Sequence, residues 1–402
     1  MIPSMTINKT KSVGFWQIFW IFLRLGLTSF GGPVAHLGYF REEFVNKRKW
    51  LSEHSYADVV SLCQFLPGPA SSQVGMVLGY SQKGYLGVIA AWLGFTAPSA
   101  IALTLFAYGI TTHSQWISLE VIHGLKIVAV AVVAQAVWGM AKSLCPDVSR
   151  ITIMMIAACF MLIFPSFIWG QIAIIVITGI FGAWYFSPKQ LAPHELLPIQ
   201  MKHSVGVVWI TLFFVLLLVF PILNDLYASQ ALAMVSAFYR AGSLVFGGGH
   251  VVLPLLQAEV VPTGWVNNET FLAGYGATQA MPGPLFTFAA FLGASTTGAI
   301  SGWLGGLICL LAIFAPSFLL VAGTLPFWET IRRNTKIQAS LMGVNAAVVG
   351  ILLSALYDPV WVSAIHKPKD FALGLVAFVA LMYWKISPWI VVIASGLVAW
   401  VI

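Results

Sequence analysis

The sequence predicts an all-α polytopic membrane protein made of two inverted-topology repeats joined by one connecting transmembrane helix. We expect broken or re-entrant helices that carry Phe-Gly-Gly and Pro-Gly-Pro motifs. Three observations predict this fold. The 402 residues are 59% hydrophobic and only 8% charged, whereas soluble domains carry about 25% charged residues. A glycine- and proline-rich pattern occurs twice in the same order, and equivalent connections in its two copies differ in positive charge.

Composition narrows the classes of function. Apolar runs of about 20 residues recur, which is the length of a membrane-crossing helix, and 16 Trp and 11 Tyr residues suit the membrane interface. The net charge of +7 comes mostly from Lys and Arg in short connections, which is typical of membrane orientation and not of nucleic-acid binding. The four cysteines are isolated, without a CxxC pair or a His/Cys cluster, so we predict no metal, cofactor or disulfide framework.

The duplicated pattern consists of ordered matches between the two halves of the chain. The matched pairs are Arg24 and Arg240, Phe30-Gly31-Gly32-Pro33 and Phe246-Gly247-Gly248-Gly249, Gln64-x-x-Pro67-Gly68-Pro69 and Gln279-x-x-Pro282-Gly283-Pro284, and Ala97-Pro98-Ser99 and Ala315-Pro316-Ser317. Chance is a poor explanation for so many matches in the same order. We therefore predict an N-terminal repeat over residues 1–186, a linker with the connecting helix over 187–229, and a C-terminal repeat over 230–402.

Positive charge indicates that the two repeats are inverted. Residues 41–49 hold four Lys and Arg residues, whereas their counterpart, residues 257–268, holds none. Later the difference reverses, because residues 111–123 hold none and their counterpart contains Arg332, Arg333 and Lys336. Cytoplasmic loops carry the excess of positive charge, so the two repeats enter the membrane from opposite sides, as in many secondary transporters. The N-terminus is expected in the cytoplasm.

Full crossings are expected over residues 85–109, 125–140, 151–164 and 168–185, with the connecting helix over 205–223. The motif segments 15–40 and 56–81 are also long enough to cross. Proline and paired glycines should break these helices. Two geometries stay open, a discontinuous crossing helix and a re-entrant hairpin with its tip near the membrane midplane. We favour hairpins, because a hairpin keeps residues 41–49 and Lys83 on the same side.

The breaks point to an anion site. Backbone groups freed by a broken helix are tolerated in a membrane only when buried in protein or lining a polar cavity, so we expect the four breaks to converge. Exposed helix N-termini there favour an anion, and glycine allows close backbone approach. The predicted substrate-binding groups at the breaks are Gly31, Gly32, Gly68, Ser71, Ser72, Gly247, Gly248 and Gly283.

Polar side chains near the motifs each allow two interpretations. Arg24 and Arg240 are costly in hydrocarbon and present a planar fork that matches oxyanions, so they either attract the anion or stabilise the broken helices. Gln64 and Gln279 either contact substrate or pair with freed backbone. Lys126, whose counterpart is Asn345, is either a ligand contact or a lysine that extends to the interface; these residues complete the predicted substrate-binding set.

Candidate proton carriers are a second group, namely His36, His250, Asp58 and Glu259. Histidine titrates near neutral pH, but for both histidines we favour a buried residue that caps a broken helix. For Asp58 and Glu259 the alternative is an acid at the membrane interface. The sequence contains no nucleophile–base pair, metal-ligand cluster or nucleotide loop, which argues against an enzyme. A carrier for a small anion is therefore predicted, and a channel built from the same broken helices is the alternative.

The paired Phe-Gly-Gly and Pro-Gly-Pro motifs, together with His36 and His250, resemble the CHR family of chromate ion transporters in its long-chain form with two homologous halves. The resemblance covers nearly the whole chain. It implies efflux of chromate from the bacterial cytoplasm across the cytoplasmic membrane, which gives chromate resistance, with sulfate as a related oxyanion. The partners it implies are chromate or sulfate, protons and the lipid bilayer, with no nucleic acid; a homodimer is left open.

Overall fold

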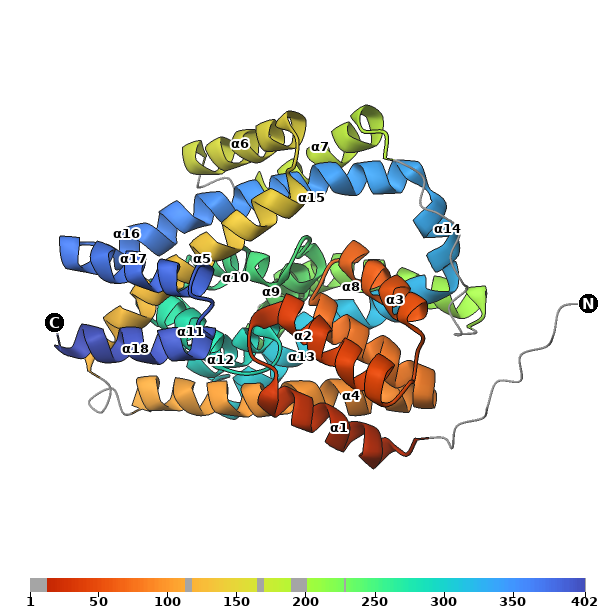
Figure 1. Cartoon of the computed structure of the whole chain (residues 1–402), viewed down its shortest axis with the longest axis horizontal. Helices are drawn as coiled ribbons and strands as arrows, with labels where there is room; N and C mark the ends of the chain where they lie inside the picture. Colours follow the sequence, from red (N-terminus) through yellow and green to blue (C-terminus); the bar gives the residue numbers. More distant parts are fainter. Residues whose placement is uncertain (1–12, 113–117, 165–169, 189–200, 228, 402) are drawn as a thin grey trace, which may run out of the picture.

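The computed structural model describes residues 13–112, 118–164, 170–188, 201–227 and 229–401. These residues form helices and connecting turns, without a strand in the described ranges (Figure 1). Five described helices are long and apolar enough to cross a membrane, which makes this a multi-pass membrane protein: Ala70–Thr112, Glu120–Leu144, His203–Tyr227, Gly302–Arg333 and Thr335–Ala364. Most of the predicted linker over residues 187–203 lies outside the described residues, as do parts of the expected connection 111–123 and the start of the expected crossing 168–185.

The first half of the chain contains α1 (Phe15–Thr28), α2 (Gly32–Arg41) with the π-helical continuation η1 (Glu42–Lys47), α3 (Glu53–Phe65), α4 (Ala70–Thr112), α5 (Leu119–Leu144), α6 (Val148–Ile163) and α7 (Gly170–Tyr185). The connecting helix is α8 (His203–Tyr227).

The second half contains α9 (Gln230–Leu244), η3 (Gly249–Val251), α10 (Val252–Val260), α11 (Asn268–Ala280), η4 (Leu285–Thr287), α12 (Phe288–Ser295), α13 (Gly302–Thr324), η5 (Leu325–Phe327), α14 (Trp328–Arg333), α15 (Thr335–Ala355), η6 (Leu356–Trp361), α16 (Val362–Ala364), α17 (Pro368–Met382) and α18 (Pro388–Val401).

The chain reverses direction at each Phe-Gly-Gly motif. Phe22 of α1 packs against Phe40 of α2 and Phe44 of η1, with ring centroids 5.7 and 5.0 Å apart. In the second half, Arg240 of α9 pairs with Glu259 of α10 at 2.6 Å. Residues before and after the motif lie side by side in both cases, so the structure has the hairpin geometry and not a discontinuous crossing helix.

The Pro-Gly-Pro motifs form the tips of a second pair of hairpins. The helix α3 begins after Ser52, whose Oγ accepts a hydrogen bond from the N–H of Ser55, and α11 begins in the same way after Asn267. Both helices have 13 residues, and 13 residues at about 1.5 Å each reach about 20 Å. That length is less than the roughly 30 Å of a hydrocarbon core, so each arm ends inside the molecule.

Glycine pairs join the return arm of each Pro-Gly-Pro hairpin to the helix that follows it. The long helix α4 bends sharply at Lys83 and Gly84, and its two arms then pack so tightly that a Cβ atom on Gly79 would collide with the carbonyl oxygen of Gly87. The same contact occurs between Gly293 of α12 and Gly305 of α13. The first arm of α4 is therefore the return arm of the α3 hairpin, and α12 is the return arm of the α11 hairpin.

Equivalent helices of the two halves run antiparallel. The second arm of α4 packs along α13, with Tyr85 beside Phe318 near the end of α13 and Trp92 beside Phe314. At the opposite end, the backbone of Gly302, which begins α13, lies against Tyr108 near the end of α4. The start of one helix thus meets the end of its equivalent, which confirms the inverted arrangement of the two repeats.

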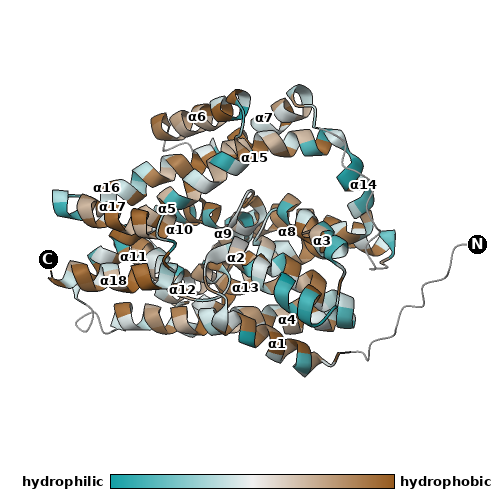
Figure 2. Ribbon diagram, viewed as in Figure 1, coloured by the Kyte–Doolittle hydropathy of each residue, from teal (hydrophilic) through white to brown (hydrophobic). Residues whose placement is uncertain are grey.

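The two halves also exchange their last helices. In the first half, α5 packs against α17 and α18 of the second half, and α15 of the second half packs against α6 and α7 of the first. Figure 1 shows α14 at the opposite end of the molecule from α16, α17 and the C-terminus. Figure 2 shows hydrophobic residues over outer helices such as α6 and α18 and hydrophilic residues on α14. Exposed apolar residues on α8, including Val208 and Leu218, suit contact with lipid.

Candidate functional site

The four hairpin tips meet at the centre of the molecule through two reciprocal hydrogen bonds. The N–H of Gly68, in the first Pro-Gly-Pro motif, donates to the carbonyl oxygen of Val245, just before the second Phe-Gly-Gly motif, at 2.7 Å. The N–H of Gly283, in the second Pro-Gly-Pro motif, donates to the carbonyl oxygen of Ser29, just before the first Phe-Gly-Gly motif, at 3.1 Å. Each half therefore supplies one donor and one acceptor to the other, at equivalent positions.

The repeated Ala-Pro-Ser element packs against these glycines. Gly68 has a φ of +120° and lies against Ser317 of α13, and Gly283 has a φ of +100° and lies against Ser99 of α4. A Cβ atom on Gly283 would be 2.9 Å from the Oγ of Ser99. Both positions need glycine for backbone conformation and for space. Ala-Pro-Ser recurs in the sequence without a sign of its role, and in the structure its serine lies behind the tip of the opposite half.

A cavity of about 890 Å³ is bounded by the tips, the second half of α5 and the turn between α17 and α18. Ten of the predicted site residues line it: Gly31, Gly32, Gln64, Gly68, Gly247, Gly248, His250, Gln279, Gly283 and Asn345. The other eight lie outside its lining: Arg24, His36, Asp58, Ser71, Ser72, Lys126, Arg240 and Glu259. The convergence of the breaks on one cavity, which the sequence predicted, is thus present in the structure.

Backbone N–H groups of the kind that bind anions line this cavity. The N–H groups of Gly31, Gly247 and Gly248 make no backbone hydrogen bond within the described residues. The helix α2 and the first arm of α4 begin at Gly32 and Ala70, which both line the cavity, and a helix N-terminus carries partial positive charge. The opposing C-terminal carbonyls of Ser29 and Val245 are occupied by the tip glycines. Three backbone N–H groups without a backbone partner among the described residues and two helix N-termini therefore lie at the cavity, and such groups can bind an anion.

The two histidines have different surroundings. His36 is buried, with Nδ1 3.3 Å from the Oγ of Ser71 and Nε2 3.1 Å from the carbonyl oxygen of Ser29. It therefore contacts the same carbonyl that Gly283 uses. His250 lines the cavity, and its Nδ1 lies 2.9 Å from the hydroxyl of Tyr275. Both the capping and the proton-relay interpretations remain compatible with these contacts.

The two equivalent arginines form equivalent ion pairs. Arg24 lies 2.8 Å from Glu43, and Arg240 makes hydrogen bonds of 2.8 and 2.6 Å to the two carboxylate oxygens of Glu259. The pairs join the two arms of the Phe-Gly-Gly hairpins. The Arg24 side chain is 62% exposed, and exposed pairs contribute about 0–1 kcal/mol. This geometry favours the structural interpretation of both arginines, and their role in attracting the anion stays a prediction.

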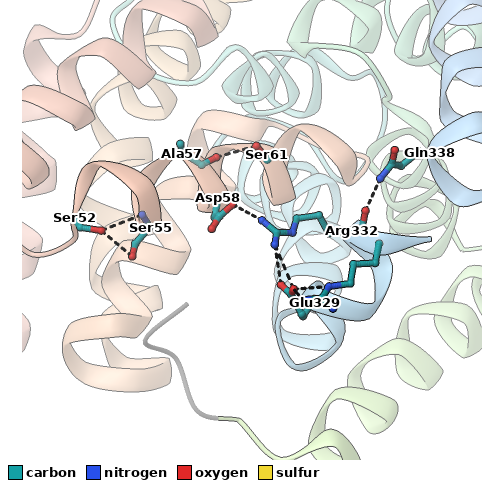
Figure 3. Close-up of polar contacts among 9 residues, drawn as sticks. Ser52, Ser55, Ala57, Asp58, Ser61, Glu329, Arg332 and Gln338 are labelled. Atoms are coloured by element: carbon teal, nitrogen blue, oxygen red, sulfur yellow. Dashed lines mark hydrogen bonds and ion pairs between the residues drawn. The ribbon is translucent and has the colours of Figure 1, made fainter. Parts of the chain in front are cut away.

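A buried ion pair connects α3 to α14. Arg332 lies 3.0 Å from Asp58 and 3.2 Å from Glu329, and the side chains of Arg332 and Asp58 are only 4% and 6% exposed. Figure 3 shows Asp58 facing Arg332 across the gap between the two helices, with Glu329 on the other side of the guanidinium. Arg332 is at the centre of this salt-bridge cluster, and its buried pairing with Asp58 supports a structural role for Asp58.

Replacing Asp58 with asparagine is expected to destabilise the protein by about 3 kcal/mol, because removing one partner leaves a buried charge incompletely compensated. Thermal unfolding in detergent measures the effect, and Arg333→Gln is the control, since the Arg333 side chain is 69% exposed. If Asp58 instead carries protons, the variant will keep its unfolding temperature and lose the pH dependence of transport.

The two Pro-Gly-Pro hairpins differ in how they pack, although their sequences match. The helix α11 packs against α5 and α18, and a Cβ atom on its Gly276 would collide with the carbonyl oxygen of Leu125. The equivalent residue of α3, Ser61, is exposed, and α3 makes no comparable contact with α15 or α7 within the described residues. The molecule is therefore closed around α11 and open around α3.

The asymmetry extends to the pair Lys126 and Asn345. Lys126 of α5 is only 8% exposed and lies 3.3 Å from Glu269 at the start of α11. Its counterpart Asn345, on α15, lines the cavity. Equivalent positions thus lie at a closed contact in one half and at the open cavity in the other. The turn between α17 and α18 also lines the cavity, although no repeated motif in the sequence marks it.

The family model described as chromate transporter matches residues 16–183 and 232–400. The chain belongs to the chromate transporter family. The two matched segments leave α8 between them, which agrees with two repeats and a connecting helix.

Within the described residues, no group of three or more His, Cys, Asp or Glu side chains could hold a metal ion.

Relatives of this chromate transporter family member include full-length and half-length chains. It is 26% identical over 400 residues to the "Probable chromate transport protein" of Synechococcus elongatus, covering 96% of this chain and 95% of the relative. It is 27% identical over 412 residues to the "Chromate transport protein" of Pseudomonas aeruginosa, covering 96% and 92%. It is 34% identical over 94 residues to the "Uncharacterized transporter YwrB" of Bacillus subtilis, covering 23% and 48%. No solved structure matches the chain significantly.

Proposed function

We propose that this protein transports chromate, a tetrahedral oxyanion, out of the cytoplasm across the bacterial cytoplasmic membrane and thereby confers chromate resistance. The single observation that carries the proposal is the meeting of four hairpin tips around one cavity, joined by the reciprocal hydrogen bonds of Gly68 and Gly283. The choice of chromate rests on family membership and on the names of the relatives.

The cavity suits a tetrahedral anion for chemical reasons. Its donors are the backbone N–H groups at the glycine tips and the side-chain amides of Gln64, Gln279 and Asn345. No Asp or Glu is among the described residues that line it. Backbone and amide donors at broken helix ends recur at the anion sites of secondary transporters. They would replace the water that surrounds the anion in solution.

We further propose alternating access between two repeats, residues 1–186 and 230–402, with residues 187–229 as the connection. The tight packing of α11 on α5 and the free face of α3 describe a state that is open on one side. Residues 41–49, which join the two hairpins of the first half, carry four Lys and Arg residues, and the positive-inside rule assigns them to the cytoplasm. The open side is then cytoplasmic and ready to receive substrate, and the N-terminus lies on the same side.

The membrane potential favours export. Moving one charge through 100 mV is worth about 2.3 kcal/mol, so a dianion leaving a negative interior gains about 4.6 kcal/mol per 100 mV. Outward movement therefore needs no coupled ion, and import would need one. Proton antiport through His36 or His250 would add further driving force, and it stays part of the proposal because both histidines contact or line the tips.

Sulfate or another small anion is the second candidate substrate. Backbone donors recognise shape and charge, and sulfate is also a tetrahedral dianion. A channel for such an anion is the alternative mechanism. The closed contact between Gly276 and Leu125 argues for a carrier, because an open channel needs a path on both sides.

Transport in proteoliposomes tests the proposal. Purified protein is reconstituted, and chromate and sulfate fluxes are measured under imposed voltage and pH gradients. We expect saturable chromate movement away from the cytoplasmic face of the protein when the solution on that side is electrically negative. Flux far above carrier rates would identify a channel, a larger flux of sulfate would change the substrate, and acceleration by an opposing pH gradient would establish proton antiport. No flux of either anion would overturn the proposal.

A further inference from the structure

The turn between α17 and α18 places a positive charge at the cavity. Lys385 is the one Lys or Arg among the described residues that line the cavity, and no Asp or Glu lines it. No carboxylate forms a salt bridge with Lys385 in the described part of the chain, whereas Arg24, Lys126 and Arg240 are each paired. The charge of Lys385 is therefore available to a ligand.

Contacts on both sides hold this turn next to the tips. The ring of Trp389, at the start of α18, lies 5.9 Å from that of Phe30 in the first Phe-Gly-Gly motif. The side-chain amide of Gln135, on α5, donates to the carbonyl oxygen of Leu381 at 3.4 Å. Within the turn, the N–H of Ile386 donates to the carbonyl oxygen of Ala380 at 3.0 Å. The wall that carries Lys385 is thus fixed to α5 and to the first tip.

Lysine is a costly residue for this position. Its φ is +53°, in the left-handed region, where a residue other than glycine costs about 1–2 kcal/mol. Its side chain is exposed in the turn between α17 and α18, so the cost of this residue lies in its backbone conformation. Strained backbone and unpaired charge at a cavity wall are features that cluster at functional sites. Neither helps to fold the turn, which glycine or asparagine would form more easily.

We propose that Lys385 supplies the positive charge that draws the oxyanion into the cavity and holds it beside the hairpin tips. This inference rests on the proposed function, because it names the charged contact of that same site. An ammonium group on a fixed turn raises the local concentration of anions in a cleft with low-dielectric walls, and salt screens the effect. The backbone donors of the tips then complete the binding of the tetrahedral ion. Lys385 assumes the role of attracting charge that the sequence suggested for Arg24 and Arg240.

Kinetics of chromate transport in proteoliposomes test the role of Lys385. Lys385→Gln is expected to raise KM for chromate by about tenfold and to remove most of the dependence of KM on ionic strength, as expected for lost electrostatic steering. Lys385→Arg should keep both. Lys385→Gly separates charge from folding, because it relieves the left-handed backbone: it should unfold at a higher temperature than the wild type and still show the raised KM. Lys142→Gln is the matched control, since Lys142 stacks on Trp138 and does not line the cavity.

The outcomes distinguish this inference from the proposed function. If the wild type transports chromate or sulfate and Lys385→Gln has the same KM and the same salt dependence, the role of Lys385 is wrong and the proposed function stands. An equal rise in KM for Lys142→Gln would also overturn it, because the effect would then be one of net charge. If the wild type transports neither anion, both proposals fail.

Discussion

Replacing Gly68 or Gly283 with alanine is expected to abolish transport. A Cβ atom on Gly68 would collide with the Oγ of Ser317 and lie 2.7 Å from the side-chain amide of Gln73. Its φ of +120° is also one that alanine rarely adopts. Strained backbone and overpacking each cost about 1–3 kcal/mol, and the strain would displace the N–H that donates to Val245. Because that hydrogen bond joins the two halves at the site, a small displacement removes the donor arrangement.

Chromate flux and thermal unfolding of the two variants are measured side by side. Gly38→Ala is the control, since Gly38 lies within α2, has no positive φ, and has nothing within 4 Å of the position that an added Cβ would take. Ser317→Ala in the Gly68→Ala background removes the colliding hydroxyl and should recover part of the lost stability. Ser99→Ala should help Gly283→Ala less, because the carbonyl oxygen of Phe95 stays 3.2 Å from the added atom. Normal flux in Gly68→Ala would show that the tips do not form the site.

The second large effect is expected at the glycine pairs that join each return arm of the Pro-Gly-Pro hairpins to the following helix. A methyl group on Gly79 would collide with the carbonyl of Gly87, and one on Gly293 with the carbonyl of Gly305. The obstacles are backbone atoms, which cannot rotate away as side chains do. Small residues let membrane helices approach this closely. Alanine at any one of the four positions should therefore separate the return arm from the following helix and cost about 3 kcal/mol, since overpacking in a tight core is poorly relieved.

The measurement is the yield of monodisperse protein after extraction and its unfolding temperature. Gly139→Ala is a suitable folding control, because Gly139 lies within α5 with nothing within 4 Å of an added Cβ. Equal losses at Gly79 and Gly293 are expected, since the contacts are equivalent. A wild-type unfolding temperature for Gly79→Ala would mean that the arms are not packed as described.

The repeats, their inversion and the convergence of the breaks could be predicted because each depends on residue types that are visible in the sequence. Prolines and glycines mark the tips, and loop charge marks the side of the membrane. The preference for hairpins is confirmed by the contact of Phe22 with Phe44 and by the pairing of Arg240 with Glu259. The family resemblance is confirmed by the match of both halves.

The sequence did not predict which helices and backbone groups contact each other, because these contacts depend on packing between distant segments. The motifs do not show that Gly68 bonds to Val245 of the other half, or that α5 packs on α17 and α18. Side-chain pairing is equally hidden: Glu259 is a candidate proton carrier by sequence, and the structure places it against Arg240. The role of Lys385 could not be predicted from the repeat, because this residue lies in a turn outside the duplicated motifs.

The reciprocal hydrogen bonds of Gly68 and Gly283 bear on how such a protein is assembled. A chain with one repeat alone would carry a donor and an acceptor that cannot reach each other, so two copies inserted in opposite directions would be required. When the two repeats are joined in one chain, they meet at high effective concentration. Their ratio is then fixed at one to one. The single helix α8 also determines orientation, because it adds one crossing between the repeats. Because α8 crosses the membrane once, the second repeat starts on the side opposite to the first. A single polypeptide can therefore contain two homologous repeats that are inserted in opposite orientations.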